Sequence, residues 1–234
     1  MRLQTLREEV LEANLELVRR GLVLGTFGNA SGIAREQGLV VIKPSGVPYE
    51  ELKPEHLVVT NFDGKIIEGK LKPSSDLPTH LVLYREFPKI GAVAHTHSEY
   101  ATAWAQARQS IPCFGTTHAD YFHGPVPVTA VMKKGKIVTE YEKNTGQVIV
   151  RAFKHLDYIA IPAVLVANHG PFSWGPDPRT AAHHAVILEA IARTAYLTLG
   201  INQGAQAIGA ELHDKHYLRK HGSRAYYGQA KKEE

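Results

Sequence analysis

Two histidines at the end of an apolar run are the residues of this sequence best placed to do chemistry. The run is Gly91-Ala92-Val93-Ala94, and His95 and His97 follow it at a spacing of i, i+2. Because side chains alternate along a β-strand, both imidazoles would project to the same side, about 7 Å apart. Two imidazoles so arranged can share one metal ion, although the pair alone also fits an exposed strand face.

Two further residues could complete a metal site. Asp76 follows Pro73-Ser74-Ser75, and His169 comes directly after the apolar run Val164-Leu165-Val166-Ala167. Three neutral imidazoles and one carboxylate suit a borderline divalent cation, with Zn as the default and Mn, Fe or Co as alternatives. The sequence therefore predicts that these four side chains converge.

Small and polar residues in three loops could bind a phosphate group. They are Gly28-Asn29, Lys43-Pro44-Ser45-Gly46 and Ser74-Ser75. Hydroxyls, backbone N–H groups, a helix N-terminus and the Lys43 ammonium together would suit an anion. Each loop taken alone also has an ordinary explanation as a turn or a helix cap.

A further polar cluster is Gly115-Thr116-Thr117-His118-Ala119-Asp120-Tyr121. Asp120 could act as a general acid or base, and it could equally be a turn or cap residue. His118 could be a core or a surface histidine. The residues themselves leave these alternatives open.

The elements that must position these residues follow from periodicity and turn signals. Apolar spacing predicts an opening helix from Leu3 to near Gly21, and Asp63-Gly64 predicts a hairpin between Leu57–Phe62 and Lys65–Glu68. Ser75 or Asp76 could cap a helix that runs to Pro88. The other expected elements are strands at 30–34, 39–42, 90–95, near Phe114 and at 163–167, and helices at 98–107, 146–155, 181–199 and up to Lys220. The expected fold class is α/β, a three-layer α/β/α sandwich with a central, mainly antiparallel or mixed sheet.

Length and composition indicate one compact domain spanning residues 1–234. A hydrophobic content of 44% can supply a substantial core, and the single cysteine, Cys113, excludes an intrachain disulfide framework. The N-terminal residues lack the apolar core of a signal peptide, so we expect a cytoplasmic protein without a membrane span. A net charge of +4, with bases and acids interleaved as in Lys231-Lys232-Glu233-Glu234, gives no stripe for nucleic acid.

Seven motifs in one order resemble the class II aldolase family, and in particular its L-ribulose-5-phosphate 4-epimerases. The resemblance covers nearly the whole chain, from the first helix to Tyr226-Tyr227-Gly228-Gln229, and the combination of motifs is highly specific. The motifs are Gly28-Asn29-Ala30-Ser31, Lys43-Pro44-Ser45-Gly46, Pro73-Ser74-Ser75-Asp76, His95-Thr96-His97, Gly115-Thr116-Thr117-His118-Ala119-Asp120, Asn168-His169-Gly170 and Lys215-His216-Tyr217-Leu218-Arg219-Lys220-His221-Gly222.

The resemblance implies a role for each matching residue. It assigns Asp120 and Tyr227 to proton transfer, and Thr116, Glu142 and His216 to supporting positions. It assigns the metal to Asp76, His95, His97 and His169, and the phosphorylated ketopentose substrate to Gly28, Asn29, Lys43, Ser45, Gly46, Ser74 and Ser75. It also implies a homotetramer with active sites at subunit interfaces, and a place in carbohydrate metabolism, in the use of arabinose, another pentose or ascorbate.

The implied reaction is epimerisation at the fourth carbon of L-ribulose 5-phosphate to give D-xylulose 5-phosphate. That carbon has no neighbouring carbonyl to acidify its C–H bond, so retro-aldol cleavage between the third and fourth carbons and re-addition is the expected route. A family aldolase of the L-fuculose 1-phosphate type would stop after cleavage. Such aldolases have Glu where this chain has Asp76, and they lack the Thr116 to Asp120 arrangement.

Two other protein classes also fit some of these residues. A non-catalytic binding module like the adducin head would share the fold, but the three histidines and the acid–base candidates argue against it. A cupin-like enzyme would also use a paired His-x-His strand, but the abundant helices fit a closed barrel poorly.

Overall fold

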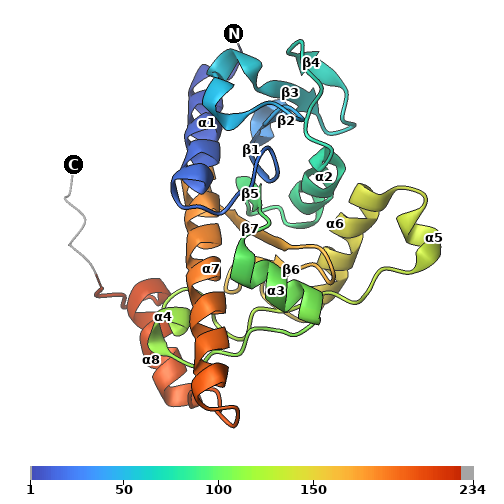
Figure 1. The fold of residues 1–234 in the computed structure, drawn as a ribbon. Coiled ribbons are helices and arrows are strands. Elements are labelled where there is room, and N and C mark those ends of the chain that lie inside the picture. Colours follow the sequence, from blue (N-terminus) through green and yellow to red (C-terminus); the bar gives the residue numbers. More distant parts are fainter. Residues whose placement is uncertain (1, 228–234) are drawn as a thin grey trace.

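Within residues 2–227, which the computed structural model describes, seven strands form one sheet in the order β4-β3-β2-β1-β5-β7-β6 (Figure 1). Every pairing between neighbouring strands is antiparallel. The strands are β1 (Asn29–Ala34), β2 (Leu39–Ile42), β3 (Val58–Asn61), β4 (Ile66–Glu68), β5 (Ala92–His95), β6 (Ala163–Leu165) and β7 (Pro171–Gly175). The motif residues Gly228 and Gln229 and the run Lys231–Glu234 lie outside the described residues.

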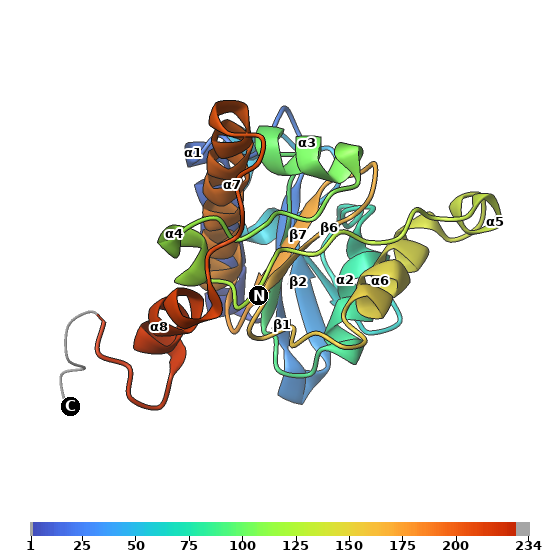
Figure 2. The same ribbon diagram turned by 90° about the horizontal axis from the view of Figure 1, so that it is seen from below.

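Helices cover both faces of the sheet, as the sequence predicts. Figure 2 shows α1 and α7 on one side and α2 and α6 on the other. The helices are α1 (Gln4–Arg19), α2 (Leu77–Glu86), α3 (Glu99–Ala107), α4 (Thr116–Ala119), α5 (Lys134–Ile137), α6 (Tyr141–Ala152), α7 (Pro178–Ile201) and α8 (Ala210–His221), and short 3₁₀ turns occupy Arg35–Gln37, Tyr49–Glu51 and Pro54–His56.

The alternation of side chains along the strands divides the core between the two faces. On β2, Val40 and Ile42 pack in one apolar cluster with Leu81 of α2. Their neighbours on the strand, Leu39 and Val41, pack in another cluster with residues of α1. The same alternation on β5 turns Val93 and then His95 toward the face that α2 covers.

Small side chains let α7 lie close against the centre of the sheet. Ala92 and Ala94 of β5 form a buried cluster with Ala181 and Ala185 of α7. By length and composition α7 is the one helix of the described part that could cross a membrane. Its buried residues instead pack against β5 and β7, while its other face is exposed.

Most of the predicted elements are confirmed to within a few residues, two differ, and one observed strand is absent from the prediction. The strand expected near Phe114 is wrong, because the chain there makes only an isolated bridge between Ile111 and Val126 before α4. The helix expected from Gly146 begins earlier, at Tyr141. Gly146 lies in the middle of this helix and does not begin it. Glycine is required there because a β-carbon would come within 2.6 Å of Val82 in α2. The strand that the sequence analysis did not predict is β7.

A buried amide joins the first helix to the first strand of the site. Asn14 Nδ2 donates to the carbonyls of Val10 (2.7 Å) and Ala30 (3.1 Å), and its Oδ1 accepts from the Ala30 N–H (2.9 Å). Asn14 thus satisfies the backbone polar groups of Ala30, which is fully buried.

We predict that Asn14→Ala lowers the free energy of unfolding by about 1–3 kcal/mol, because it leaves buried backbone groups of Ala30 unpaired. Urea unfolding followed by circular dichroism measures this. Glu9→Ala, at an exposed position of the same helix, is the control and should change stability by less than about 0.5 kcal/mol. Equal stability of the two variants would contradict the role assigned to Asn14.

Candidate metal centre and substrate site

Three imidazoles converge where β5 and the β6–β7 hairpin meet. The ligand nitrogens of His95, His97 and His169 all lie within 4.8 Å of one another, and the Nε2 atoms of His95 and His97 are 3.1 Å apart. His95 is the last residue of β5, whereas His97 lies in the loop that leads to α3. The predicted strand end at His95 is confirmed. The two rings meet because the loop turns His97 toward His95, and not through side-chain alternation along a strand as expected.

The orientation of His95 is fixed by strand β7. His95 pairs with Phe172 across the two strands, and its ring stacks on the Phe172 ring with 4.1 Å between centroids. Its Nδ1–H donates to the Pro171 carbonyl at 2.9 Å. That hydrogen bond selects the tautomer whose Nε2 lone pair is free to bind a cation.

A tight turn presents His169. The Val166 N–H donates to the Gly170 carbonyl, and Asn168 adopts a left-handed conformation with φ of 61°. The Tyr141 hydroxyl lies 3.3 Å from Nδ1 of His169. Tyr141 begins α6, and the sequence analysis did not single it out, since its partner is 28 residues away.

Two imidazoles of this cluster, those of His97 and His169, are held neutral. Burial lowers the pKa of His97, and burial together with the neighbouring His95 lowers the pKa of His169 to about 3. Neutral imidazoles keep the lone pairs that a metal ion needs. These nitrogen donors therefore fit a borderline divalent cation. The structure brings together three of the four predicted ligands, His95, His97 and His169.

Asp76, the fourth predicted ligand, lies beside the three-histidine cluster rather than among its members. It occupies the position before α2 but does not cap the helix; its Oδ2 accepts from Asn29 Nδ2 at 2.7 Å. Burial acts to raise the pKa of Asp76, but the neighbouring His95 and His80 side chains and the Asn29 hydrogen bond lower it by more. Asp76 is therefore a carboxylate next to three imidazoles.

The loops predicted to bind a phosphate are joined to one another. The Ser45 N–H donates to the Lys72 carbonyl and the Ser74 N–H to the Lys43 carbonyl, both at 2.9 Å. Ser45, Gly46 and Ser75 are exposed and Ser74 is half-buried. Their exposed groups can therefore meet a ligand from solvent.

Lys43 and Gly28 connect these loops to the metal centre. Only 2% of Lys43 is exposed, and burial lowers its pKa to about 8. Gly28 has φ of 78°, and a β-carbon there would come within 2.9 Å of the His95 carbonyl. Glycine at this position thus lets the loop before β1 lie directly against the metal-binding strand.

A second polar cluster surrounds Asp120, which follows α4. Its carboxylate accepts from His216 Nδ1 at 3.0 Å and from the Arg219 guanidinium at 3.0 and 2.7 Å, and Lys220 Nζ lies 3.7 Å away. Burial raises the pKa of Asp120, but the hydrogen bonds from Arg219 and His216 and the Lys220 charge lower it by more. The structure thus joins Asp120 to the predicted His216.

Three other predicted site residues, Tyr227, Thr116 and Glu142, lie in different parts of the structure. The Tyr227 ring lies under Arg219, with the guanidinium carbon 4.7 Å from the ring centroid, and is largely exposed. Thr116 is the first residue of α4. Glu142 lies in the first turn of α6, where its carbonyl accepts from the Thr79 hydroxyl. Sequence reasoning missed Arg219, although it stands in the quoted motif around His216.

The histidine cluster and the Asp120 cluster are separate within one chain. Among residues 2–227 no hydrogen bond or ion pair joins them. In both views α4 and α8 lie beside α7, away from α2 and α6 (Figures 1 and 2). One chain therefore carries the predicted metal ligands and the predicted proton-transfer groups at two different places.

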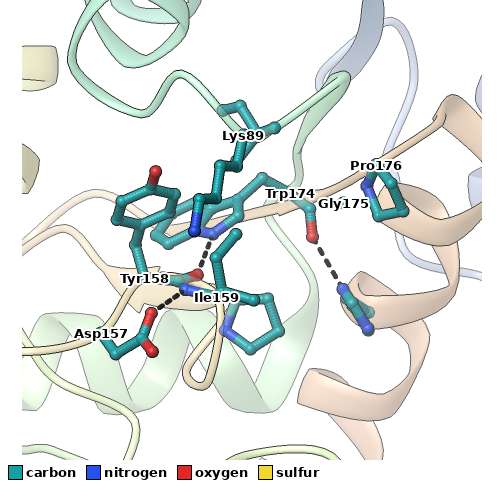
Figure 3. A pocket seen from close by; sticks show the side chains of 10 residues that line it. Lys89, Asp157, Tyr158, Ile159, Trp174, Gly175 and Pro176 are labelled. Carbon is teal, nitrogen blue, oxygen red and sulfur yellow. Dashed lines mark hydrogen bonds between the residues drawn. The ribbon is translucent and has the colours of Figure 1, made fainter. Parts of the chain in front are cut away.

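A cavity of about 400 Å³ lies at the opposite end of β5 and β7 from the histidines. Lys89, Tyr158, Trp174 and His184 are among its lining residues (Figure 3). The Trp174 indole N–H donates to the Tyr158 carbonyl, and His184 Nδ1 donates to the Trp174 carbonyl. None of the predicted site residues lines this cavity.

An antiparallel sheet covered by helices on both faces, with His95 at the end of β5 and His97 and His169 in adjacent loops, forms a site that suits a divalent metal ion. Residues 8–196 match the family model described as Class II Aldolase and Adducin N-terminal domain. The chain therefore belongs to the class II aldolase and adducin family.

Named proteins with related sequences or structures show which members of the family this chain is similar to. The chain is 51% identical over 227 residues to the L-ribulose-5-phosphate 4-epimerase UlaF of Salmonella paratyphi A and of Salmonella typhi, which covers 97% of this chain and all of each relative. Among solved structures it is similar to an L-fuculose 1-phosphate aldolase, with a TM-score of 0.78 and 26% identity over 92% of this chain and 95% of that one. YgbL from Klebsiella pneumoniae gives a TM-score of 0.73 and 29% identity over 91% and 97% of the two chains.

We predict that the protein binds one Zn²⁺ or Mn²⁺ per subunit and that His97→Ala removes most of that affinity, because a three-imidazole set loses a ligand. Calorimetric titration of the metal-free protein measures binding directly. His184→Ala, at the distal cavity, is the control and should bind metal as the parent does. Equal affinity in the parent and His97→Ala proteins would contradict the site.

Proposed function

We propose that this protein is a metal-dependent L-ribulose-5-phosphate 4-epimerase, an isomerase that forms D-xylulose 5-phosphate. The observation that carries the proposal is the convergence of three imidazoles next to a loop pair with an ammonium and exposed hydroxyls. That arrangement suits a phosphorylated sugar whose other end meets a metal ion. The full-length identity of 51% to relatives named for this reaction supports the same substrate.

The metal centre would hold its ion through His95, His97, His169 and Asp76. When bound, the ion supplies a Lewis acid for the negative charge that develops on oxygen as a carbon–carbon bond breaks. Asn29 holds the Asp76 carboxylate, and the Pro171 carbonyl holds His95 in the ligating tautomer. We propose Zn as the native ion, with Mn or Co able to replace it.

The substrate's phosphate would be held by the paired loops. Ser45, Gly46, Ser74 and Ser75 supply hydroxyls and N–H groups, and Lys43 supplies positive charge. Gly28 and Asn29 would contact the sugar beside the metal. This hold is required because cleavage between the third and fourth carbons frees a two-carbon aldehyde phosphate that must rotate without escaping.

The retro-aldol route requires two proton transfers at the hydroxyl oxygen of the fourth carbon. The hydroxyl on the fourth carbon loses its proton as the bond breaks, and the new alkoxide gains one after the aldehyde has turned its other face. Asp120 and Tyr227 are proposed for these two tasks, on opposite faces of the aldehyde. His216 orients the Asp120 carboxylate, and Thr116 and Glu142 are proposed supporting residues.

An active site built this way needs two subunits, because the two clusters are apart within one chain. We propose a homotetramer in which the C-terminal segment with His216 and Tyr227, together with Asp120 after α4, completes the histidine cluster of a neighbour. The exposed apolar face at the end of α7, with Tyr196, Leu197 and Ile201, offers contact area for assembly. We place the enzyme in the cytoplasm, in the catabolism of arabinose or another pentose.

An aldolase of the L-fuculose 1-phosphate type is the second candidate, favoured by the fold similarity to such an enzyme. It would also use the three histidines, but it would release two fragments. Incubation with L-ribulose 5-phosphate and nuclear magnetic resonance of the products separates the two. D-xylulose 5-phosphate supports the epimerase, whereas turnover confined to free fragments supports the aldolase.

Asp120→Asn and Tyr227→Phe should each lower kcat by about 10² to 10⁴-fold, the usual contribution of a positioned acid or base. Metal content should stay at the parental value, since neither side chain lies in the histidine cluster. Steady-state kinetics with metal analysis measures both quantities. Loss of bound metal from a folded variant would count against the assignment.

Co-production of Asp120→Asn and His97→Asn subunits should restore activity to about a quarter of the parental value, because one in four randomly formed interfaces joins two intact clusters. Each variant alone should stay inactive. Kinetics on the purified hybrid checks this. An inactive hybrid of confirmed mixed composition, or an active monomer in sedimentation, would reject the shared site.

The pKa of Lys43, about 8, predicts the pH dependence of substrate binding. This value lies below the ordinary lysine value, so the ammonium loses its proton as the pH rises through about 8. At pH 9 about one tenth of Lys43 carries charge, and KM should be roughly tenfold higher than at pH 7. Lys43→Met should abolish this rise, whereas a parental KM that is flat up to pH 9.5 would contradict it.

A further inference from the structure

Tyr49 is a buried tyrosine that touches both halves of the proposed substrate site. It begins the short 3₁₀ turn after the Lys43 loop, and 3% of it is exposed. Its hydroxyl lies 3.0 Å from the Phe27 carbonyl and 2.9 Å from the Gly28 carbonyl, and donates its proton to this pair. Burial raises the pKa of Tyr49, so the phenol stays a donor throughout the physiological range.

The ring of Tyr49 faces the ammonium of Lys43. Lys43 Nζ lies 4.5 Å from the ring centroid, and its one hydrogen bond in the described structure goes to the Thr26 carbonyl at 3.2 Å. Among residues 2–227 no carboxylate forms an ion pair with Lys43. A buried ammonium is ordinarily paired with an anion, so the ring and one carbonyl are an incomplete environment for it.

We propose that Tyr49 is a positioning residue of the substrate site, holding the Lys43 ammonium with its ring and the Phe27-Gly28 backbone with its hydroxyl for a phosphorylated ligand. The inference rests on the proposed role of Lys43 in binding phosphate. Tyr49 itself need not touch the substrate.

One side chain thereby couples the phosphate-binding cation to the metal-binding strand. Gly28 lies directly against the His95 carbonyl, and the next residue, Asn29, pairs with His95 across β1 and β5. A shift of the Gly28 carbonyl would therefore move the loop that adjoins both Asn29 and His95. Phenylalanine would keep the cation–π contact and lose this anchor, while leucine would lose both.

The test separates the two contacts. Tyr49→Phe removes the hydroxyl, and Tyr49→Leu also removes the aromatic face. KM for L-ribulose 5-phosphate and the binding constant of inorganic phosphate, by calorimetry, are measured for both variants with and without Lys43→Met. Tyr158→Phe, a half-buried tyrosine at the distal cavity, is the matched control, and thermal unfolding verifies that each variant is folded.

Tyr49→Phe should raise KM about threefold to tenfold, as expected for one lost hydrogen bond to a carbonyl pair. Tyr49→Leu should weaken phosphate binding a further threefold or more by removing the cation–π contact. That further loss should disappear in the Lys43→Met background, because the ring acts through the ammonium. The Tyr158→Phe protein should keep the parental KM.

Two results would overturn the proposal. One is folded Tyr49 variants whose KM and phosphate affinity stay within twofold of the parent. The other is a Tyr49→Leu effect that is equally large in the Lys43→Met background, which identifies a purely structural tyrosine. Failure of the proposed function looks different, because the parent would then not convert L-ribulose 5-phosphate, while phosphate binding would still report on Tyr49.

Discussion

The antiparallel pairing of β1, β5 and β7 is the constraint on which the rest of the site depends. It sets His95 opposite Asn29 on one side and opposite Phe172 on the other. From that register follow the stacking of the His95 ring, the hydrogen bond to the Pro171 carbonyl, and the hold of Asn29 on Asp76. A slip of one residue would turn His95 to the α7 face, where β5 presents Ala92 and Ala94 to the helix.

The sheet accommodates this polar centre because its two faces are built differently. Alanines at β5 and α7 allow close packing on one face, so the strands are held rigidly from behind. On the other face α2 supplies both core side chains such as Leu81 and the carboxylate of Asp76 at its start. Three imidazoles, a carboxylate and a buried ammonium are thereby fixed before any ligand arrives, which is what preorganised binding requires.

Sequence reasoning predicted what local pattern controls. The period of α1, the Asp63-Gly64 hairpin and the His95-His97 spacing are local signals, and the structure brings His95, His97 and His169 together as expected. Strand β7 was not predicted because Pro171 and Gly175 at its ends are poor strand formers, although Phe172 and Trp174 alternate with smaller residues. Tertiary packing sets three contacts that no spacing along the chain predicts. They are those of Tyr141 with His169, Arg219 with Asp120, and Tyr49 with Lys43.

The separation of the two clusters within one chain is what the proposed shared site would require. In that proposal the Asp120 cluster of one subunit would meet the histidine cluster of a neighbour, and the substrate would be cleaved and rebuilt between them. The product formed from L-ribulose 5-phosphate in D₂O, examined by nuclear magnetic resonance, tests this most directly. The account predicts D-xylulose 5-phosphate that keeps protium on its fourth carbon, and deuterium at that carbon, or no such product, would contradict it.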